Sequence, residues 1–239
     1  MSLGLNLGLA LMDTAEMYGD GAAEELVGSA MKRRRDEVFL VSKVLPSHAG
    51  RDQTIRASED GLPRLGTDRV DLHLLQGRGS TPLEETLEAL VEDGKIRHWG
   101  MSNFDHDDME ELVGVPGGAR VSTGQVLYNL DRRDIEWDLL PWCQQRRVPI
   151  MAYSPIEQGR LLNHDAVAEV RACHHVTPSQ VVLTCMLRHD GVVPVPKAGT
   201  PEHVRENHAA LDLELSDEDL DELDQAFPPP SEPQPLEML

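Results

Sequence analysis

The segment Asp13-Thr14-Ala15-Glu16-Met17-Tyr18-Gly19 is the stretch from which the fold and chemistry of this chain are predicted. It follows an apolar run at residues 7–12, so it lies where a strand ends and a loop begins. Two interpretations are open. In the first, the segment is structural: Asp13 or Thr14 caps a turn by bonding backbone amides, and Tyr18 is half-buried. In the second, the side chains of the segment take part in a reaction. In the second case Tyr18 delivers a proton to a substrate oxygen beside a cation that Asp13 holds in place.

Short β-branched or aliphatic runs alternate with amphipathic, charge-rich segments along the chain. The runs predict strands at Leu9–Met12, Val38–Ser42, Val70–Leu75, Ile96–Met101, Val121–Leu127, Val148–Ala152 and Val192–Val195. The segments between them predict helices at Ala22–Arg34, Gln53–Leu65, Pro82–Glu92, Asp107–Val113, Trp137–Arg146, Pro178–Arg188 and Pro201–Ala210. A last helix, Asp217–Ala226, is expected to begin after a Ser216 cap. This alternation is typical of parallel βαβ units.

The predicted fold class is α/β, a (β/α)8 TIM barrel with its first strand missing and seven recognisable strands. Such a barrel typically takes about 250 residues, and this chain has 239. Residues 3–8, just before the first predicted strand, are helical in character. Either the barrel closes on seven strands, or one sheet edge is open. Residues 1–230 are predicted to form a single domain, followed by a loosely ordered Pro-rich tail at residues 231–239.

Polar side chains stand at or after the end of each predicted strand. They are Asp13, Tyr18, Lys43, Gln76, Ser102, Asn103, Gln125, Tyr153, Ser154 and Lys197. Because the carboxyl ends of parallel strands meet at one rim of a barrel, these side chains are expected to converge there. The sequence therefore favours the chemical interpretation of the Asp13–Gly19 segment.

Composition excludes several other classes of protein. The longest apolar runs fall short of the eighteen or so residues that cross a membrane, and the first residues lack a basic secretory n-region. Three cysteines without a C-x-x-C pair indicate reduced cytoplasm, and the ten histidines show no zinc spacing. A net charge of −20 disfavours nucleic acid and anionic membranes as partners. The basic run Lys32–Arg35 is either a solvated helix C-terminus or a binding patch.

Several longer motifs point to one family. They are D-T-A-E-M-Y-G (Asp13–Gly19), V-F-L-V-S-K (Val38–Lys43), R-L-G-T-D-R-V-D-L (Arg64–Leu72), G-K-I-R-H-W-G-M-S-N-F (Gly94–Phe104), Q-V-L-Y-N-L (Gln125–Leu130), A-Y-S-P (Ala152–Pro155) and V-P-K-A-G-T-P-E-H-V-R-E-N (Val195–Asn207). Together, over residues 3–230, they resemble the aldo-keto reductases, particularly the bacterial, short-looped members. The resemblance implies an NADPH-dependent barrel enzyme that reduces a small aldehyde or ketone; it says nothing of oligomeric state.

The resemblance also implies catalytic roles. Tyr18 protonates the carbonyl oxygen while hydride reaches the carbon, Lys43 stabilises the phenolate, and Asp13 holds Lys43 charged and in place. Free tyrosine, with a pKa of about 10, is a poor acid at neutral pH, so a neighbouring cation makes physical sense.

The cofactor contacts that the resemblance implies fall into two groups. Those for the nicotinamide and pyrophosphate are Ser102, Asn103, Gln125, Tyr153, Ser154, Ile156, Gln158 and Gly159; those for the adenosine end are Lys197, Thr200, His203, Glu206 and Asn207. Lys197 suggests a 2′-phosphate partner and so NADPH over NADH. His203 stands where many relatives have arginine, with Arg205 close by in sequence.

Four departures from the family pattern matter. Gln76-Gly77 replaces the family's histidine, usually followed by tryptophan, that orients the substrate carbonyl. His73 cannot stand in, because it lies three positions earlier and a strand alternates its faces. The family's first strand and its hairpin are absent, the helix after Pro82 is about three residues short, and Pro63 interrupts the preceding helix. Two alternatives therefore stay open: a non-catalytic NADP(H)-binding sensor or scaffold, or a poorly folding truncated form.

Overall fold

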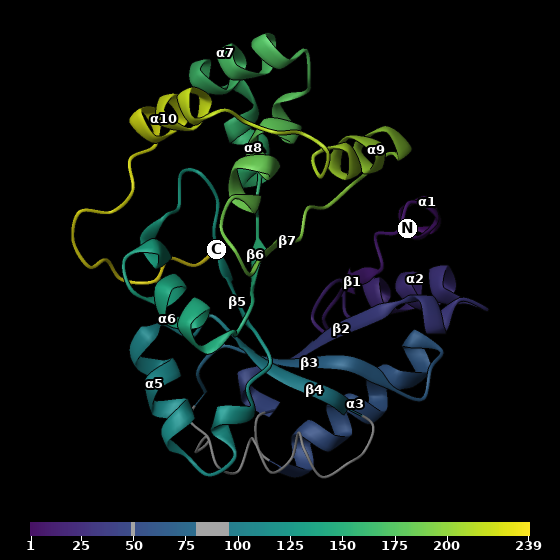
Figure 1. Cartoon of the computed structure of the whole chain (residues 1–239). Helices are drawn as coiled ribbons and strands as arrows, with labels where there is room; N and C mark the ends of the chain where they lie inside the picture. The colour runs from purple at the N-terminus through teal and green to yellow at the C-terminus, as the bar shows by residue number, and fades with distance from the viewer. Residues whose placement is uncertain (49–50, 80–95) are drawn as a thin grey trace. The chain divides into compact units, whose positions relative to one another are not determined.

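The computed structural model describes residues 1–48, 51–79 and 96–239, which divide into two compact units, residues 1–124 and 125–239 (Figure 1). The predicted helix Pro82–Glu92 lies outside the described residues. All seven predicted strands are present, with ends that shift by at most three residues.

Four parallel strands form the sheet of the first unit: β1 (Leu11–Asp13), β2 (Phe39–Val44), β3 (Val70–Gln76) and β4 (Ile96–Ser102). They pair in chain order, β1 with β2, β2 with β3, and β3 with β4. Each of these strands extends one or two residues past its predicted end, so the polar residues Asp13, Lys43, Gln76 and Ser102 lie within the ladder. Their side-chain directions are consequently set by the sheet.

The helices described in the first unit are α1 (Ser2–Asn6), α2 (Ala22–Met31), α3 (Arg51–Leu65) and α5 (His106–Gly114), with short 3₁₀ segments at Arg35–Glu37, Pro46–His48 and Gly118–Arg120. Before α5, Asp105 and Asp108 form a reciprocal capping box. Pro63 lies in the last turn of α3, two residues before the helix ends at Leu65.

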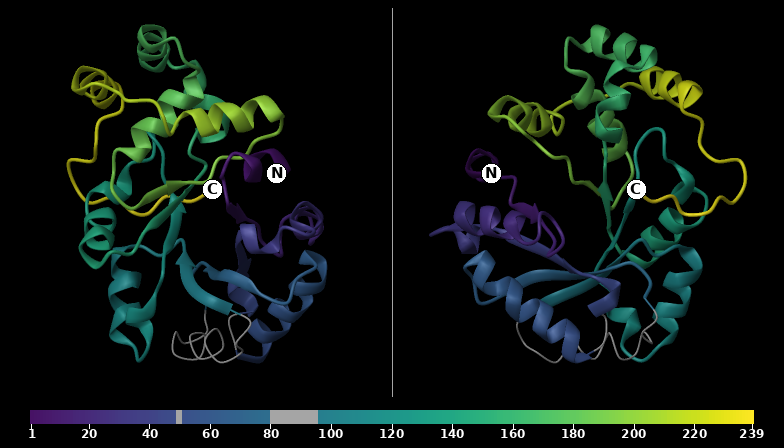
Figure 2. Two further views of the ribbon diagram at one scale, coloured as in Figure 1. Left: turned by 45° about the vertical axis from the view of Figure 1, so that its right-hand side comes forward. Right: turned by 180° about the vertical axis from the view of Figure 1, so that it is seen from behind.

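Helices α2 and α3 pack on one face of the β1–β3 sheet (Figure 2). Val27 and Met31 of α2 meet Met12 and Leu40 of the strands in one buried apolar cluster. Gly28 lets the two helices approach closely, because a Cβ there would lie 2.6 Å from the carbonyl oxygen of Leu65. This layer leaves the opposite sheet face for the polar side chains described below.

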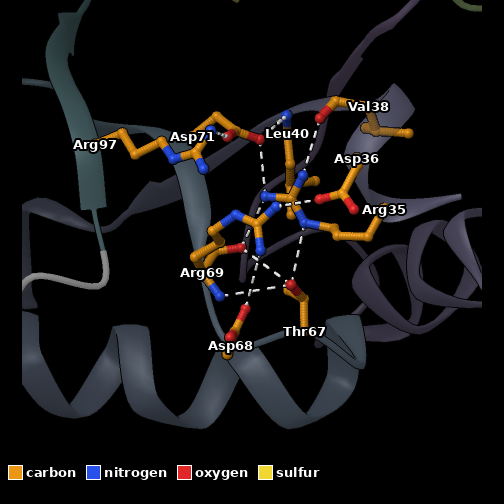
Figure 3. A network of polar contacts seen from close by, with 9 residues as sticks. All are labelled: Arg35, Asp36, Val38, Leu40, Thr67, Asp68, Arg69, Asp71 and Arg97. Atoms are coloured by element: carbon orange, nitrogen blue, oxygen red, sulfur yellow. Dashed lines mark hydrogen bonds and ion pairs between the residues drawn. The ribbon is translucent and has the colours of Figure 1, made fainter.

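The run Lys32–Arg35 begins at the C-cap of α2, where Lys32 and Arg33 are exposed, but the helix ends three residues before the predicted Arg34. Helix α2 stops at Met31, and Arg33 takes a left-handed φ of +70°. Arg35 turns inward, and its guanidinium pairs with buried Asp71 at 2.7 Å (Figure 3). Arg97 donates to the other Asp71 oxygen at 3.1 Å, and the backbone amide of Leu40 donates to Oδ2 at 2.9 Å. The run is thus partly a structural anchor near the amino-terminal ends of β2 and β3.

The second unit contains β5 (Gly124–Leu127, whose first residue closes the first unit), β6 (Ile150–Tyr153) and β7 (Val192–Pro194), and β6 and β7 pair in parallel. Its helices are α6 (Leu139–Arg146), α7 (Asp165–His174), α8 (Pro178–Leu187), α9 (Pro201–Ala209) and α10 (Asp217–Ala226), with 3₁₀ segments at Asp134–Glu136 and Glu157–Asn163. Ser216 caps α10 as predicted. Helix α7 was not predicted. It buries only Val167 and Val170, so its sequence shows little apolar periodicity.

Helices α7, α8 and α10 share the apolar core of the second unit, in which Val170, Val182 and Leu223 are fully buried. The C-terminal tail is anchored, contrary to the expectation of loose order. Glu237 pairs with Arg132, and its backbone amide donates to Asp134 Oδ2 at 3.1 Å. Within the described ranges, no helix has the length and apolar character needed to span a bilayer.

Candidate active site

Lys43 is the centre of a buried polar cluster in the first unit. Its ammonium donates to Asp13 Oδ2 at 2.6 Å and to the backbone oxygen of Thr14 at 3.0 Å. A third donor reaches the hydroxyl oxygen of Tyr18 at 3.3 Å. The Lys43 side chain is only 1% exposed, so these three acceptors replace the water that a lysine cation normally binds.

This geometry determines which way the Tyr18 hydroxyl acts. An ammonium has only donors, so the phenol oxygen accepts from Lys43, and its own proton remains available to another acceptor. The Tyr18 side of the cluster opens outward, since that residue is 40% exposed while Lys43 is buried. The ammonium also lies 4.9 Å from the centre of the phenol ring, which adds a cation–π attraction. A phenol held in this way can serve as a proton donor to a bound carbonyl.

The loop that presents Tyr18 is fastened by a residue that the sequence analysis did not assign to the site. Glu16 Oε1 accepts from the backbone amide of Leu45 at 2.8 Å and lies 3.1 Å from His48 Nδ1. Leu45 directly follows β2, so Glu16 ties the Tyr18 loop to the strand that carries Lys43. The signal was present, because Glu16 stands inside the Asp13–Gly19 motif.

Gln76 lies on the same sheet face as Lys43. In the parallel register Lys43 pairs with Leu74, two residues before Gln76, and Gln76 pairs with Ser102. Paired residues and residues two apart share a face, so Lys43, Gln76 and Ser102 project together.

His73 projects to the other face, paired with Ser42 and Trp99 in the ladder. Burial lowers the pKa of His73 to about 4, so it stays neutral in the folded chain. The register thus agrees with the expectation that His73 does not replace the family histidine.

Three buried oxygens in the first unit have no hydrogen-bond partner among the described residues: Thr14 Oγ1, Gln76 Oε1 and Asn103 Oδ1. Buried polar atoms are nearly always paired in folded proteins, so such atoms call for a ligand or water. Asn103 is also held at φ +55°, a left-handed conformation that is uncommon outside glycine and often marks functional positions. An unpaired acceptor on Asn103 fits the amide donor of a nicotinamide carboxamide.

In the second unit the predicted pyrophosphate loop has an unusual backbone. Ser154, Gln158 and Gly159 all have positive φ, at +50°, +54° and +91°. Asn129, fully buried, holds this loop by donating to the Ser154 carbonyl at 3.0 Å and to Glu157 Oε2 at 2.7 Å. The sequence analysis quoted Asn129 in a motif but gave it no role. Of the other predicted contacts in this unit, Gln125 is buried within β5, Tyr153 ends β6, and Ile156 precedes Gln158 in the loop.

The residues predicted for the adenosine end gather around the start of α9. Thr200 is the N-cap, and its hydroxyl accepts from the backbone amide of His203 at 3.2 Å. His203, Glu206 and Asn207 are three and four residues apart, so they share one face of the helix. Lys197 is exposed in the segment before it. Arg205 lies off that face, with its guanidinium 3.3 Å from the carbonyl of Pro201 in its own helix.

Parallel βα units in which one strand ends in Asp13 and the next carries a buried lysine one residue before its end are the arrangement expected of a barrel enzyme that reduces carbonyl groups. Comparison with known proteins identifies the family: the Aldo/keto reductase family matches residues 1–227, and this chain belongs to it.

Individual relatives agree with this assignment. Methylglyoxal reductase YeaE of Escherichia coli is 50% identical, with 99% of this chain and 86% of that protein aligned. Glyoxal reductase of Bacillus subtilis is 34% identical over 91% of this chain and 78% of its own length. An aldo-keto reductase from Klebsiella pneumoniae, crystallised with NADPH, is 48% identical with a TM-score of 0.97, covering 99% of this chain and 86% of that one. The predicted family and (β/α)8 barrel fold class are therefore confirmed.

Proposed function

We propose that this protein reduces small aldehydes and ketones to alcohols with NADPH, using Tyr18 as the general acid. The observation that carries the proposal is the Lys43 ammonium bound between the Asp13 carboxylate and the Tyr18 hydroxyl, at 2.6 and 3.3 Å. Relatives named as methylglyoxal and glyoxal reductases make 2-oxoaldehydes the first substrates to test.

Each member of the cluster has a distinct task. Tyr18 gives its proton to the substrate oxygen as negative charge develops there, and Lys43 stabilises the phenolate that remains. Asp13 holds the buried ammonium in place through its 2.6 Å hydrogen bond. NADPH, when bound, supplies the hydride that reduces the carbonyl carbon.

The proposed cofactor contacts are those assigned above. In the first unit, Asn103 and Ser102 would hold the nicotinamide. The positive-φ loop would hold the pyrophosphate, and Lys197 with the exposed face of α9 would bind the 2′-phosphate and adenosine. The unpaired Asn103 oxygen supports this assignment, because a carboxamide offers it a donor.

Gln76 takes the position from which the substrate carbonyl is oriented. Its amide can donate a hydrogen bond, but unlike histidine it cannot carry a charge. Losing one well-placed donor at such a site typically costs on the order of 10²–10³ in rate. We therefore expect Gln76→His to raise kcat/KM for methylglyoxal, measured by NADPH oxidation; an unchanged value would mean that the amide orients the carbonyl as well as an imidazole does.

Turnover of methylglyoxal with NADPH tests the function directly. Tyr18→Phe is expected to lower kcat by about 10²–10⁴, while NADPH binding, followed by tryptophan fluorescence, is retained. Equal rates for the variant and the wild type would contradict the assigned acid. The replacement of the family histidine by Gln76 favours a second candidate, a non-catalytic NADP(H)-binding protein, for which NADPH binds normally but neither protein turns over.

A further inference from the structure

We propose that Gln76 selects substrates in which a hydroxyl group lies on the carbon next to the carbonyl, so that 2-hydroxy aldehydes and ketones are preferred over simple ones. This inference rests on the proposed function and names its substrate class. The structural basis is the Gln76 side chain at the end of β3, on the sheet face that carries Lys43, whose amide oxygen has no hydrogen-bond partner among the described residues.

The first step concerns the hydrogen bonds of the amide. Gln76 Oε1 is buried and without a partner among the described residues. A buried acceptor left unpaired carries a free-energy cost. A bound substrate that carries an O–H group beside its carbonyl removes that cost, whereas one with only a methyl group there does not.

The second step concerns geometry. The register places Gln76 two residues beyond the partner of Lys43 and directly opposite Ser102. The Lys43 ammonium binds the Tyr18 hydroxyl, so the proton donor and the amide serve the same face of the sheet.

The third step concerns chemical complementarity. A side-chain amide carries a donor and an acceptor on one carbon, which suits a partner that presents an acceptor and a donor on adjacent atoms. A 2-hydroxy carbonyl compound does this, because its carbonyl oxygen accepts from Nε2 and its hydroxyl donates to Oε1. A histidine at this position would offer the carbonyl a donor, but its second nitrogen lies on the other side of the ring. The acceptor for the hydroxyl is therefore particular to the amide.

The fourth step concerns room for the hydroxyl. Gly77 follows Gln76 at φ +112°, a conformation that residues with a side chain rarely adopt. The nearest atom to a Cβ built there is Pro46 Cγ, at 3.7 Å. The backbone conformation therefore favours glycine at this position, and the residue next to the amide brings no side chain toward a bound hydroxyl.

The overall reaction balances as a two-electron reduction. The carbonyl carbon gains a hydride, the oxygen gains the Tyr18 proton, and NADPH is oxidised to NADP⁺. The product is a 1,2-diol, and Tyr18 regains its proton from water.

A matched pair of ketones tests the inference. Hydroxyacetone and 2-butanone have nearly the same shape and differ in a hydroxyl against a methyl. For the wild type, kcat/KM for hydroxyacetone is expected to exceed that for 2-butanone by at least 10-fold, about what one hydrogen bond of 1.4 kcal/mol gives. Gln76→Met removes both polar atoms at similar volume, and the ratio is expected to fall toward one. The ketones are hydrated to the same extent in the assays of both proteins. Hydration therefore cancels when the wild-type preference for hydroxyacetone is divided by that of the variant.

Gln76→His provides a second variant that keeps a donor. It is expected to gain rate on 2-butanone and to lose the hydroxyacetone preference. A ratio that stays the same in both variants overturns the inference while leaving carbonyl reduction intact. Absence of NADPH oxidation by the wild type with these ketones and with methylglyoxal overturns the proposed function, and this inference with it. An independent readout is the inhibition constant of 1,2-propanediol relative to 2-butanol, which is expected to favour the diol in the wild type and not in Gln76→Met.

Discussion

The first unit contains two carboxylate–cation clusters near opposite ends of the same sheet, and they differ in what they leave unsatisfied. Near the amino-terminal ends of the strands, Asp71 accepts from Arg35, Arg97 and the amide of Leu40 (Figure 3). Arg35 in turn donates from all three nitrogens to neighbouring side-chain and backbone oxygens. At the carboxyl ends, Lys43 is also saturated, but Tyr18 is 40% exposed and Gln76 keeps an acceptor that is unpaired within the described part of the chain. The first cluster is closed on itself; the second is complete only with a ligand.

This difference indicates that the Asp71 cluster serves the stability of the protein and the Lys43 cluster serves its activity. Charges that are fully paired within the protein hold elements together, and removing one partner leaves an uncompensated buried charge. A site for chemistry instead keeps donors and acceptors free for the substrate and accepts some cost in stability. The four predictions below test that separation, from the largest expected effect to the smallest.

Lys43→Met should have the largest effect, and on activity. It removes the cation that stabilises the Tyr18 phenolate, so kcat for methylglyoxal is expected to fall by about 10³ or more. Steady-state NADPH oxidation measures it, with far-UV circular dichroism as a check on folding. Activity within a factor of ten of the wild type would show that the two clusters do not differ as described.

Asp71→Ala should act mainly on stability. It leaves the partly buried Arg35 without its carboxylate, and the free energy of unfolding is expected to fall by about 3–5 kcal/mol. Urea denaturation followed by circular dichroism measures this change. In conditions where the variant is folded, KM and kcat are expected to stay within about twofold of the wild type, and a specific loss of kcat would contradict the assignment.

The lowered pKa of His73, which lies on the sheet face opposite Lys43, makes the free energy of unfolding depend on pH. Its pKa is about 4 in the folded chain and about 6.5 in the unfolded one, so the unfolded state binds the extra proton between these values. The stability that neutral His73 provides is therefore complete above pH 6.5 and declines as pH falls toward 4, by up to about 3 kcal/mol.

The measurement for His73 is urea unfolding at pH 7 and pH 5. Between pH 7 and pH 5 the free energy of unfolding of the wild type is expected to fall by about 2 kcal/mol more than that of His73→Gln. Each pH unit below 6.5 contributes about 1.4 kcal/mol. Other acidic groups titrate in both proteins and drop out of the difference. Equal losses in the two proteins would show that His73 takes up its proton in the folded state.

Arg97→Gln should have the smallest effect. The Arg97 side chain is 58% exposed, and Asp71 keeps its bonds to Arg35 and to the Leu40 amide without it. Water screens such a pair, so the free energy of unfolding is expected to change by about 0–1 kcal/mol. The free energies of unfolding of Arg97→Gln and Asp71→Ala are compared by urea denaturation. A decrease in Arg97→Gln as large as that in Asp71→Ala would mean that Arg97 is the main partner of Asp71.

Several elements could be predicted from the sequence because their causes are local. The seven strands follow from short β-branched runs, and the caps at Asp105 and Ser216 follow from side chains that bond amides three residues away. Helix α7 was not predicted, because only two of its residues, both valines, are buried. The end of α2 was misplaced because a basic run resembles a helix C-terminus, whereas Arg35 is drawn inward by Asp71, 36 residues later.

The sequence by itself determined the family, the order of the strands and the polar residues at the strand ends, because these depend on residue type and spacing along the chain. Only the tertiary structure decided which of those residues touch. Lys43 meets Asp13 across thirty residues, and Gln76 shares its face, because the parallel register aligns the ends of β1, β2 and β3. Hydrogen bonding also depends on what surrounds an atom, so the unpaired oxygen of Gln76 could be found only in the folded chain.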